Sequence, residues 1–143
     1  MSTAKSVDYE GCARRHLRDA GTLHSGGGHA NAGQLYGFSV ECGLKALLVQ
    51  SGIPVDTQGN IEEGFRTHLP RLPHMVFEMT TLPDGRSASA LLAAVPHLGK
   101  MHDWKVDHRY WKETALPRKS LPDWAMAAQE MVLHLDNVKQ GLL

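Results

Sequence analysis

The chain has 143 residues with 15 basic and 15 acidic side chains, so its formal net charge is zero. This length predicts one domain, residues 1–143, able to bury a core of its own, and no apolar run approaches the roughly 20 residues of a membrane span. A neutral chain is not a strongly basic nucleic-acid binder, although a local basic patch is compatible with it. The N-terminal MSTAKSVDYEGC has no apolar core, so we expect no signal peptide and a cytoplasmic location.

Helical periodicity is clear in three segments, and no segment alternates as a strand does. The first predicted helix covers about residues 7–23, with Ser6 as its N-cap, and Ser-Gly-Gly-Gly-His at 25–29 ends it. No strand precedes this glycine run and no Gly-Lys-Ser/Thr follows it, so we interpret it as a helix–helix connection and not as a phosphate-binding loop. Cys12 and Cys42 both fall in helical patterns and are expected to be reduced.

The second predicted helix, residues 30–50, is unusual in its glycines, Gly33, Gly37 and Gly43. Each glycine costs about 1 kcal/mol relative to alanine inside a helix, so an offsetting reason is needed. We predict that another helix approaches closely where these small residues lie. The polar residues 52–66 that follow are expected to form a mobile connection on the surface.

The second half of the chain is predicted to be less regular. Two helices are expected, one beginning near residue 68 and a short one over 87–98, followed by an aromatic and charged segment at 104–111. The last helix is expected to begin with Ser120 as its N-cap and Asp123 at the capping-box position. The whole chain therefore predicts an all-α, up-and-down helical bundle of four to five helices.

The nine histidines raise the question of a metal site. The spacings HxxxH, HExxH and CxxC are all absent. The pair His102-Asp103 supplies too few ligands alone. We therefore predict no metal site and no cofactor, with the histidines on the surface or hydrogen-bonded.

Glu41 and Lys45 place an acid and a base one turn apart on the second predicted helix, in the order that favours an ion pair. A carboxylate removed from water needs a cation and hydrogen bonds, and Lys45, Arg15 and Arg109 are candidate partners. Two interpretations stay open. The residues form either a structural network that ties this helix to segment 104–111 or a functional polar site in a groove.

Several positions together resemble the HEPN domains, which are helical bundles of prokaryotic toxins, defence proteins and nucleotidyltransferase partners. The resemblance covers about residues 14–110, and its most specific part is the second predicted helix. The matching positions in that helix are Gly37, Glu41, Leu44, Lys45, Ala46 and Leu47. His68-Leu69 with Leu72 resembles the family's entry to its third helix. A tail found in one subgroup is similar at Trp104, Val106, Arg109 and Tyr110.

The resemblance implies a bundle that is often a homodimer, in a toxin–antitoxin or defence system with a nucleotidyltransferase-type antitoxin as partner. Many HEPN domains are metal-independent ribonucleases. In these a His accepts the proton of a ribose 2′-hydroxyl, and an Arg shortly before it holds the phosphate. No His follows Arg109 at that spacing in this chain, and His108 precedes it, so enzymatic activity stays an open question.

Three functions follow from these observations. The first is a module that binds a nucleotide, an RNA or a partner protein in a groove. The groove residues would be Asn31, Glu41, Lys45, His68, Arg109 and Tyr110. The second is a ribonuclease with His68 or His108 as base and Arg109 on the phosphate. The third is a purely structural interaction protein. Tyr110, Trp104 or Trp111 would stack on a base, or the tryptophans would lie in the core or a dimer contact.

Overall fold

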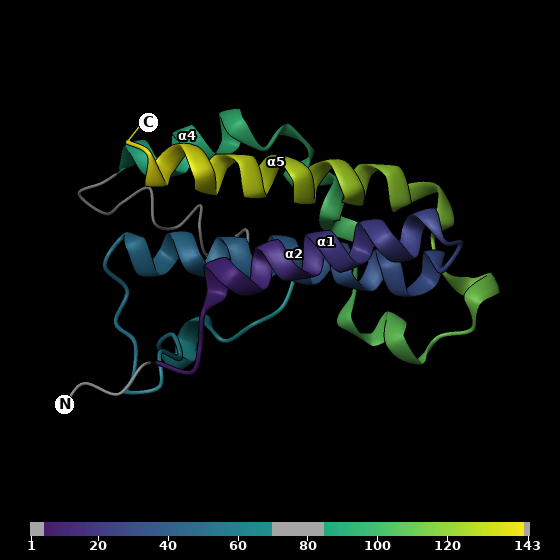
Figure 1. The fold of residues 1–143 in the computed structure, drawn as a ribbon, viewed down its shortest axis with the longest axis horizontal. Coiled ribbons are helices and arrows are strands. Elements are labelled where there is room, and N and C mark those ends of the chain that lie inside the picture. The colour runs from purple at the N-terminus through teal and green to yellow at the C-terminus, as the bar shows by residue number, and fades with distance from the viewer. Residues whose placement is uncertain (1–4, 70–84, 142–143) are drawn as a thin grey trace.

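The computed structural model describes residues 5–69 and 85–141, and this part of the chain is mostly helical (Figure 1). Its α-helices are α1 (Tyr9–Ser25), α2 (His29–Gln50), α4 (Gly85–Ala94) and α5 (Leu121–Lys139). Short 3₁₀ helices connect them: η1 (Glu63–Phe65), η3 (Pro96–Asp103), η4 (Val106–Tyr110), η5 (Glu113–Ala115) and η6 (Arg118–Ser120). Apart from one isolated bridge, these residues form no strand, which confirms the predicted all-α bundle. The helix expected to begin near residue 68 falls mostly outside the described residues.

Helices α1 and α2 form an antiparallel pair (Figure 1). Ser39 Oγ in the middle of α2 donates to the Ala13 carbonyl of α1 at 2.7 Å. Near the turn between the helices, His24 Nδ1 lies 2.8 Å from the Tyr36 hydroxyl. The two bonds pair an early residue of one helix with a later residue of the other, as antiparallel packing requires. None of the described helices is long and apolar enough to cross a membrane.

Helix α5 covers α2 and runs in the same direction (Figure 1). The Trp124 ring of α5 lies over Gly33 of α2. Further along both helices, Met131 lies over Gly43. Both glycine positions are filled by large side chains of α5, so a Cβ there would collide with them. The N-termini of α2 and α5 consequently lie at the same end of the bundle.

Gly37, between those two positions, lies against the indole of Trp104, which follows η3. Trp104 is completely buried, and its Nε1–H donates to the Gly33 carbonyl at 3.0 Å. The predicted close packing at the glycines is confirmed. Large side chains, and not the backbone of a second helix, fill the space beside them. Trp104 is a core residue and anchors the chain that continues into η4.

The helix ends differ from the sequence prediction in two places. Helix α1 begins at Tyr9, and its cap is Asp8, whose carboxylate accepts from the Gly11 amide at 2.9 Å, and not Ser6. Ser120 does precede α5, but its hydroxyl donates to the Asp103 carboxylate and caps no α5 amide. The expected helix at 87–98 is α4, which ends before Pro96 because proline has no amide hydrogen to continue it.

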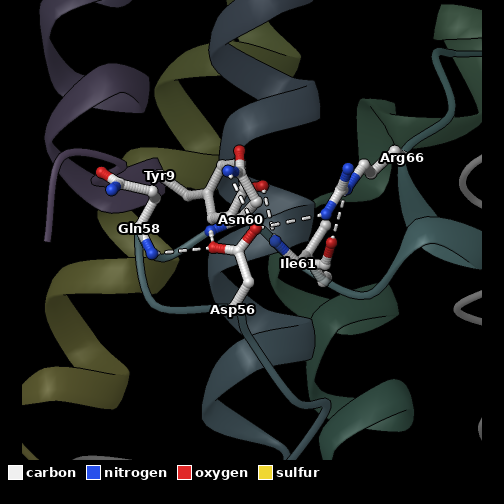
Figure 2. A network of polar contacts seen from close by, with 6 residues as sticks. All are labelled: Tyr9, Asp56, Gln58, Asn60, Ile61 and Arg66. Carbon is white, nitrogen blue, oxygen red and sulfur yellow. Dashed lines mark hydrogen bonds and ion pairs between the residues drawn. The ribbon is translucent and has the colours of Figure 1, made fainter.

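The connection after α2 was expected to be mobile, but a polar network fixes it (Figure 2). Asp56 accepts from the amides of Gln58 and Asn60, both at 2.9 Å. The Ile61 amide donates to the Tyr9 hydroxyl of α1 at 2.9 Å, and the Ile61 side chain is buried. This loop lies at the end of the bundle opposite to η4–η6 (Figure 1).

Candidate functional site

The predicted groove residues occupy two separate places along α2. The first is the middle of the helix, where Glu41 is 5% and Lys45 8% exposed. Glu41 Oε2 lies 3.6 Å from Lys45 Nζ. Its other oxygen lies 2.9 Å from His68 Nδ1 and accepts from the Leu69 amide at 3.3 Å. Glu41 therefore ties α2 to the segment that follows η1.

This arrangement corrects the predicted link between Glu41 and segment 104–111. Arg109 and Arg15 are both exposed, and neither is among the described polar partners of Glu41. Gln34, which donates to the Val106 carbonyl at 3.2 Å, makes the link to that segment instead. Gln34 and Glu41 are seven residues apart, about 10 Å along a helix, so the carboxylate is too far along α2 to serve η4.

His68 is the accessible member of the mid-helix cluster, with 51% of its side chain exposed. His16 of α1 is near enough to feel the Glu41 charge, and its ring packs against Phe38 with centroids 5.8 Å apart. Burial and the adjacent Arg15 charge lower the pKa of His16. The buried carboxylate thus orients an imidazole that faces solvent.

The second place is the end of the bundle where α2 begins and η4 packs. Asn31 is exposed in the first turn of α2. In η4 the Tyr110 side chain is 76% exposed, and the Arg109 guanidinium lies 4.9 Å from its ring centroid. Trp111 is 42% exposed, with Lys105 Nζ 5.6 Å from its ring. Two large aromatic rings therefore face solvent, each with a cation beside it.

His108 lies beneath these aromatic rings and is 7% exposed. Trp111 meets it edge-on, with centroids 4.6 Å apart, and Trp124 stacks on it at 5.9 Å. The Lys105 amide can only donate, and it points at His108 Nδ1 from 3.4 Å. The proton of the neutral ring therefore sits on Nε2. Burial, together with the Lys105 charge, lowers the pKa of His108, so the ring is neutral near pH 7.

His108 lines a pocket of about 50 Å³ between the start of α2 and the start of α5. The other lining residues are His29, Ala30, Gln34, Leu116, Pro117, Arg118, Leu121 and Trp124. None of these described residues is acidic. Arg118 has 67% of its side chain exposed and only a distant pairing with Glu113, at 4.0 Å. The pocket therefore combines an exposed cation with imidazoles inside an apolar wall.

Sequence reasoning found His108, Arg109 and Tyr110 but missed the pocket residues His29 and Arg118. His29 was assigned to a turn, and Arg118 to no element. Only the parallel packing of α2 and α5 brings these two positions together, and no local pattern reports that packing. Among the described residues, no group of three or more potential ligands could hold a metal ion.

Comparisons with protein-family models, with curated proteins and with solved structures find no match for this chain.

Proposed function

We propose that this protein is a binding module for single-stranded RNA, and that the surface formed by Lys105, Arg109, Tyr110 and Trp111 receives the bases. The observation that supports this most directly is the exposure of Tyr110 and Trp111 next to cations. Large exposed aromatic side chains that gather on one surface indicate a binding site. Single-stranded nucleic acids bind where aromatic rings stack on bases and nearby cations meet phosphates.

The local charge supports the same proposal, although the whole chain is neutral. Residues 100–119 contain six Lys or Arg and three Asp or Glu, a formal charge of +3. Such a patch attracts phosphates over a Debye length, about 8 Å at physiological salt. The surface also rests on a rigid base, because the buried Trp104 holds one end of the segment against α2. Pre-organised side chains lose less entropy on binding.

The proposal is tested by fluorescence anisotropy with a labelled ten-nucleotide single-stranded RNA. Tyr110→Ala is expected to weaken binding about tenfold, since stacking contributes about 1–3 kcal/mol per base. Leu133→Ala is the matched control, because Leu133 is 60% exposed but lies near the far end of α5. Absence of binding at micromolar protein, or equal affinity of the two variants, would overturn the proposal. Binding of a protein partner instead would favour the interaction module.

A ribonuclease is the second candidate, and one observation favours it. Glu41 orients His68 while half of the imidazole stays exposed, an arrangement found where a His acts as general base. His68 and the η4 residues pack on different turns of α2, so His108 and Arg109 would not share its site. A metal-free RNA cleavage assay tests this candidate. Activity that survives His68→Ala would rule out His68 as the base.

Within this proposal the protein is cytoplasmic and belongs to the HEPN domains by its resemblance at Glu41, Lys45 and His68. A homodimer and a nucleotidyltransferase-type antitoxin are the assemblies that the resemblance predicts. Size-exclusion chromatography with light scattering measures the first. Co-purification with the product of a neighbouring nucleotidyltransferase gene tests the second.

A further inference from the structure

The pocket beside the stacking surface has a charge pattern that base stacking does not require. Its polar side chains include the Arg118 guanidinium and two imidazoles, and no acidic residue lines it. His108 Nε2 carries the ring proton, has no partner among the described residues and, unlike His134 Nδ1, is not sealed from solvent. The Gln34 amide nitrogen is already used by the Val106 carbonyl. The donors that remain available are the His108 ring, the His29 ring and the Arg118 guanidinium, whose ion pair with Glu113 is long at 4.0 Å.

The N-terminus of α2 adds to the positive potential at this place. Helix α2 begins after Gly28 with no side-chain cap and no acidic residue in its first turn. Its first intrahelical bond is donated by Ala32 to Gly28, which leaves the amides of the three residues before Ala32 without helical partners. Ala30 lines the pocket, and so does Leu121, the first residue of α5. The α2 end contributes about half a positive charge, whereas Asp123 in the first turn of α5 offsets the charge of that end.

The size of the pocket restricts what can enter it. Its free volume is about 50 Å³, and one water molecule needs about 10–15 Å³ of such space, so the pocket holds about four water molecules. A single tetrahedral oxyanion matches it in both size and charge.

We propose that this pocket binds the terminal phosphate monoester of an RNA chain whose adjacent bases stack on Tyr110 and Trp111. The inference rests on the proposed function and adds a preference for phosphorylated ends. A phosphodiester inside a chain has only two free oxygens and one negative charge, and the chain continues on both sides of it. A monoester has three free oxygens, carries up to two charges and ends the chain, so it can enter a pocket that opens on one side only.

Each donor is expected to bond to the phosphate from a different side. Arg118 reaches the phosphate from the open side and can donate two parallel hydrogen bonds. His108 donates through Nε2 from the buried side, in an orientation fixed by Trp111 and Trp124. The helical amides of α2 complete the shell, as at other helix N-termini that bind anions.

The test compares three ten-nucleotide RNAs of one sequence with the full-length protein. One carries a 5′-phosphate, one a 3′-phosphate, and one has hydroxyl groups at both ends, with the fluorophore always attached within the chain. The RNA whose phosphate lies at the end that enters the pocket, either the 5′ or the 3′ end, is expected to bind about tenfold more tightly than the hydroxyl form. The reason is that hydrogen bonds to charged groups contribute about 1.5–3 kcal/mol. Inorganic phosphate at millimolar concentration should remove this advantage and leave the hydroxyl RNA unaffected.

Arg118→Ala should abolish the preference, and Arg118→Lys should restore part of it. Lys119→Ala is the matched control, because Lys119 is adjacent, exposed and equally charged but does not line the pocket. Equal binding of all three RNAs would overturn the inference and leave the proposed function standing. Loss of the preference in both alanine variants would also overturn it, since the effect would then be general charge. Failure of every RNA to bind would instead refute the proposed function.

Discussion

Replacing Gly37 by alanine tests how Trp104 is held in the core. The substitution removes a helix-breaking residue from α2, and on propensity alone it should stabilise the protein by about 1 kcal/mol. The new methyl group would overlap the indole of Trp104, which is completely buried and cannot turn aside into solvent. The ring must therefore shift within a packed core.

The expected magnitude follows from the contacts of the ring. Overpacking a core costs about 1–3 kcal/mol. Displacing the indole also removes the hydrogen bond from Trp104 Nε1 to the Gly33 carbonyl, which contributes about 1 kcal/mol. After the gain in helix propensity, Gly37→Ala should lower the free energy of unfolding by about 2 kcal/mol. A loss of this size lowers Tm by about 6 °C in a chain of this length.

Gly21 provides the matched control, since it also lies inside a helix, α1, but no atom lies within 4 Å of a Cβ placed there. Gly21→Ala should raise the free energy of unfolding by about 0.5–1 kcal/mol. Urea denaturation followed by circular dichroism measures both variants. If Gly37→Ala is as stable as Gly21→Ala, the packing of Trp104 against α2 described here is incorrect. Gly37→Ala should also weaken RNA binding, because Trp104 anchors the segment that carries Tyr110.

Three further predictions concern buried polar groups. His134 is buried, its Nδ1 has no partner in the described chain, and burial lowers the pKa of its ring. As pH falls, His134 is therefore protonated in the unfolded chain at a higher pH than in the folded protein. The stability that the neutral buried ring contributes is fully present above about pH 6.5 and is lost below it. His134→Leu should reduce the dependence of the unfolding free energy on pH between 7 and 5, and an unchanged slope would contradict the buried placement. Glu41→Leu should destabilise the protein by about 3 kcal/mol, because Lys45 stays buried without its anion. Adding Lys45→Met should recover part of this loss in the same urea titration, whereas a still larger loss would argue against a buried pair. Cys42 is partly buried, and burial raises the pKa of its thiol to about 12, so iodoacetamide at pH 8 should label this thiol much faster in urea than in the native protein. Mass spectrometry of the peptides decides this, and rapid native labelling would count against the burial.

The helices were predictable because their signals are local. Apolar residues at helical spacing located α1, α2 and α5, and Pro96 located the end of α4. The interior glycines of α2 correctly indicated close packing. Their partners were not predictable, since Trp104, Trp124 and Met131 are brought to them by tertiary contacts.

The candidate site was only partly predictable for the same reason. A buried acid such as Glu41 needs a partner, but its position in the sequence does not say which one. Of the three candidate partners, Lys45 does lie 3.6 Å from the carboxylate, but Arg15 and Arg109 do not contact it. The fold brings His68 and the Leu69 amide to the carboxylate instead. The rest of the site depends on the two helix N-termini that converge near Arg118, and the direction of one helix relative to another is not encoded in any single motif.

The most direct test of the proposed RNA surface is an amide NMR titration of the ¹⁵N-labelled protein with single-stranded RNA carrying a terminal phosphate. We expect the largest amide chemical-shift changes at the start of α2, residues 28–34, and between residues 105 and 121. Those two segments form one end of the bundle (Figure 1). The largest changes around Glu41 and His68, or no changes at all, would contradict it.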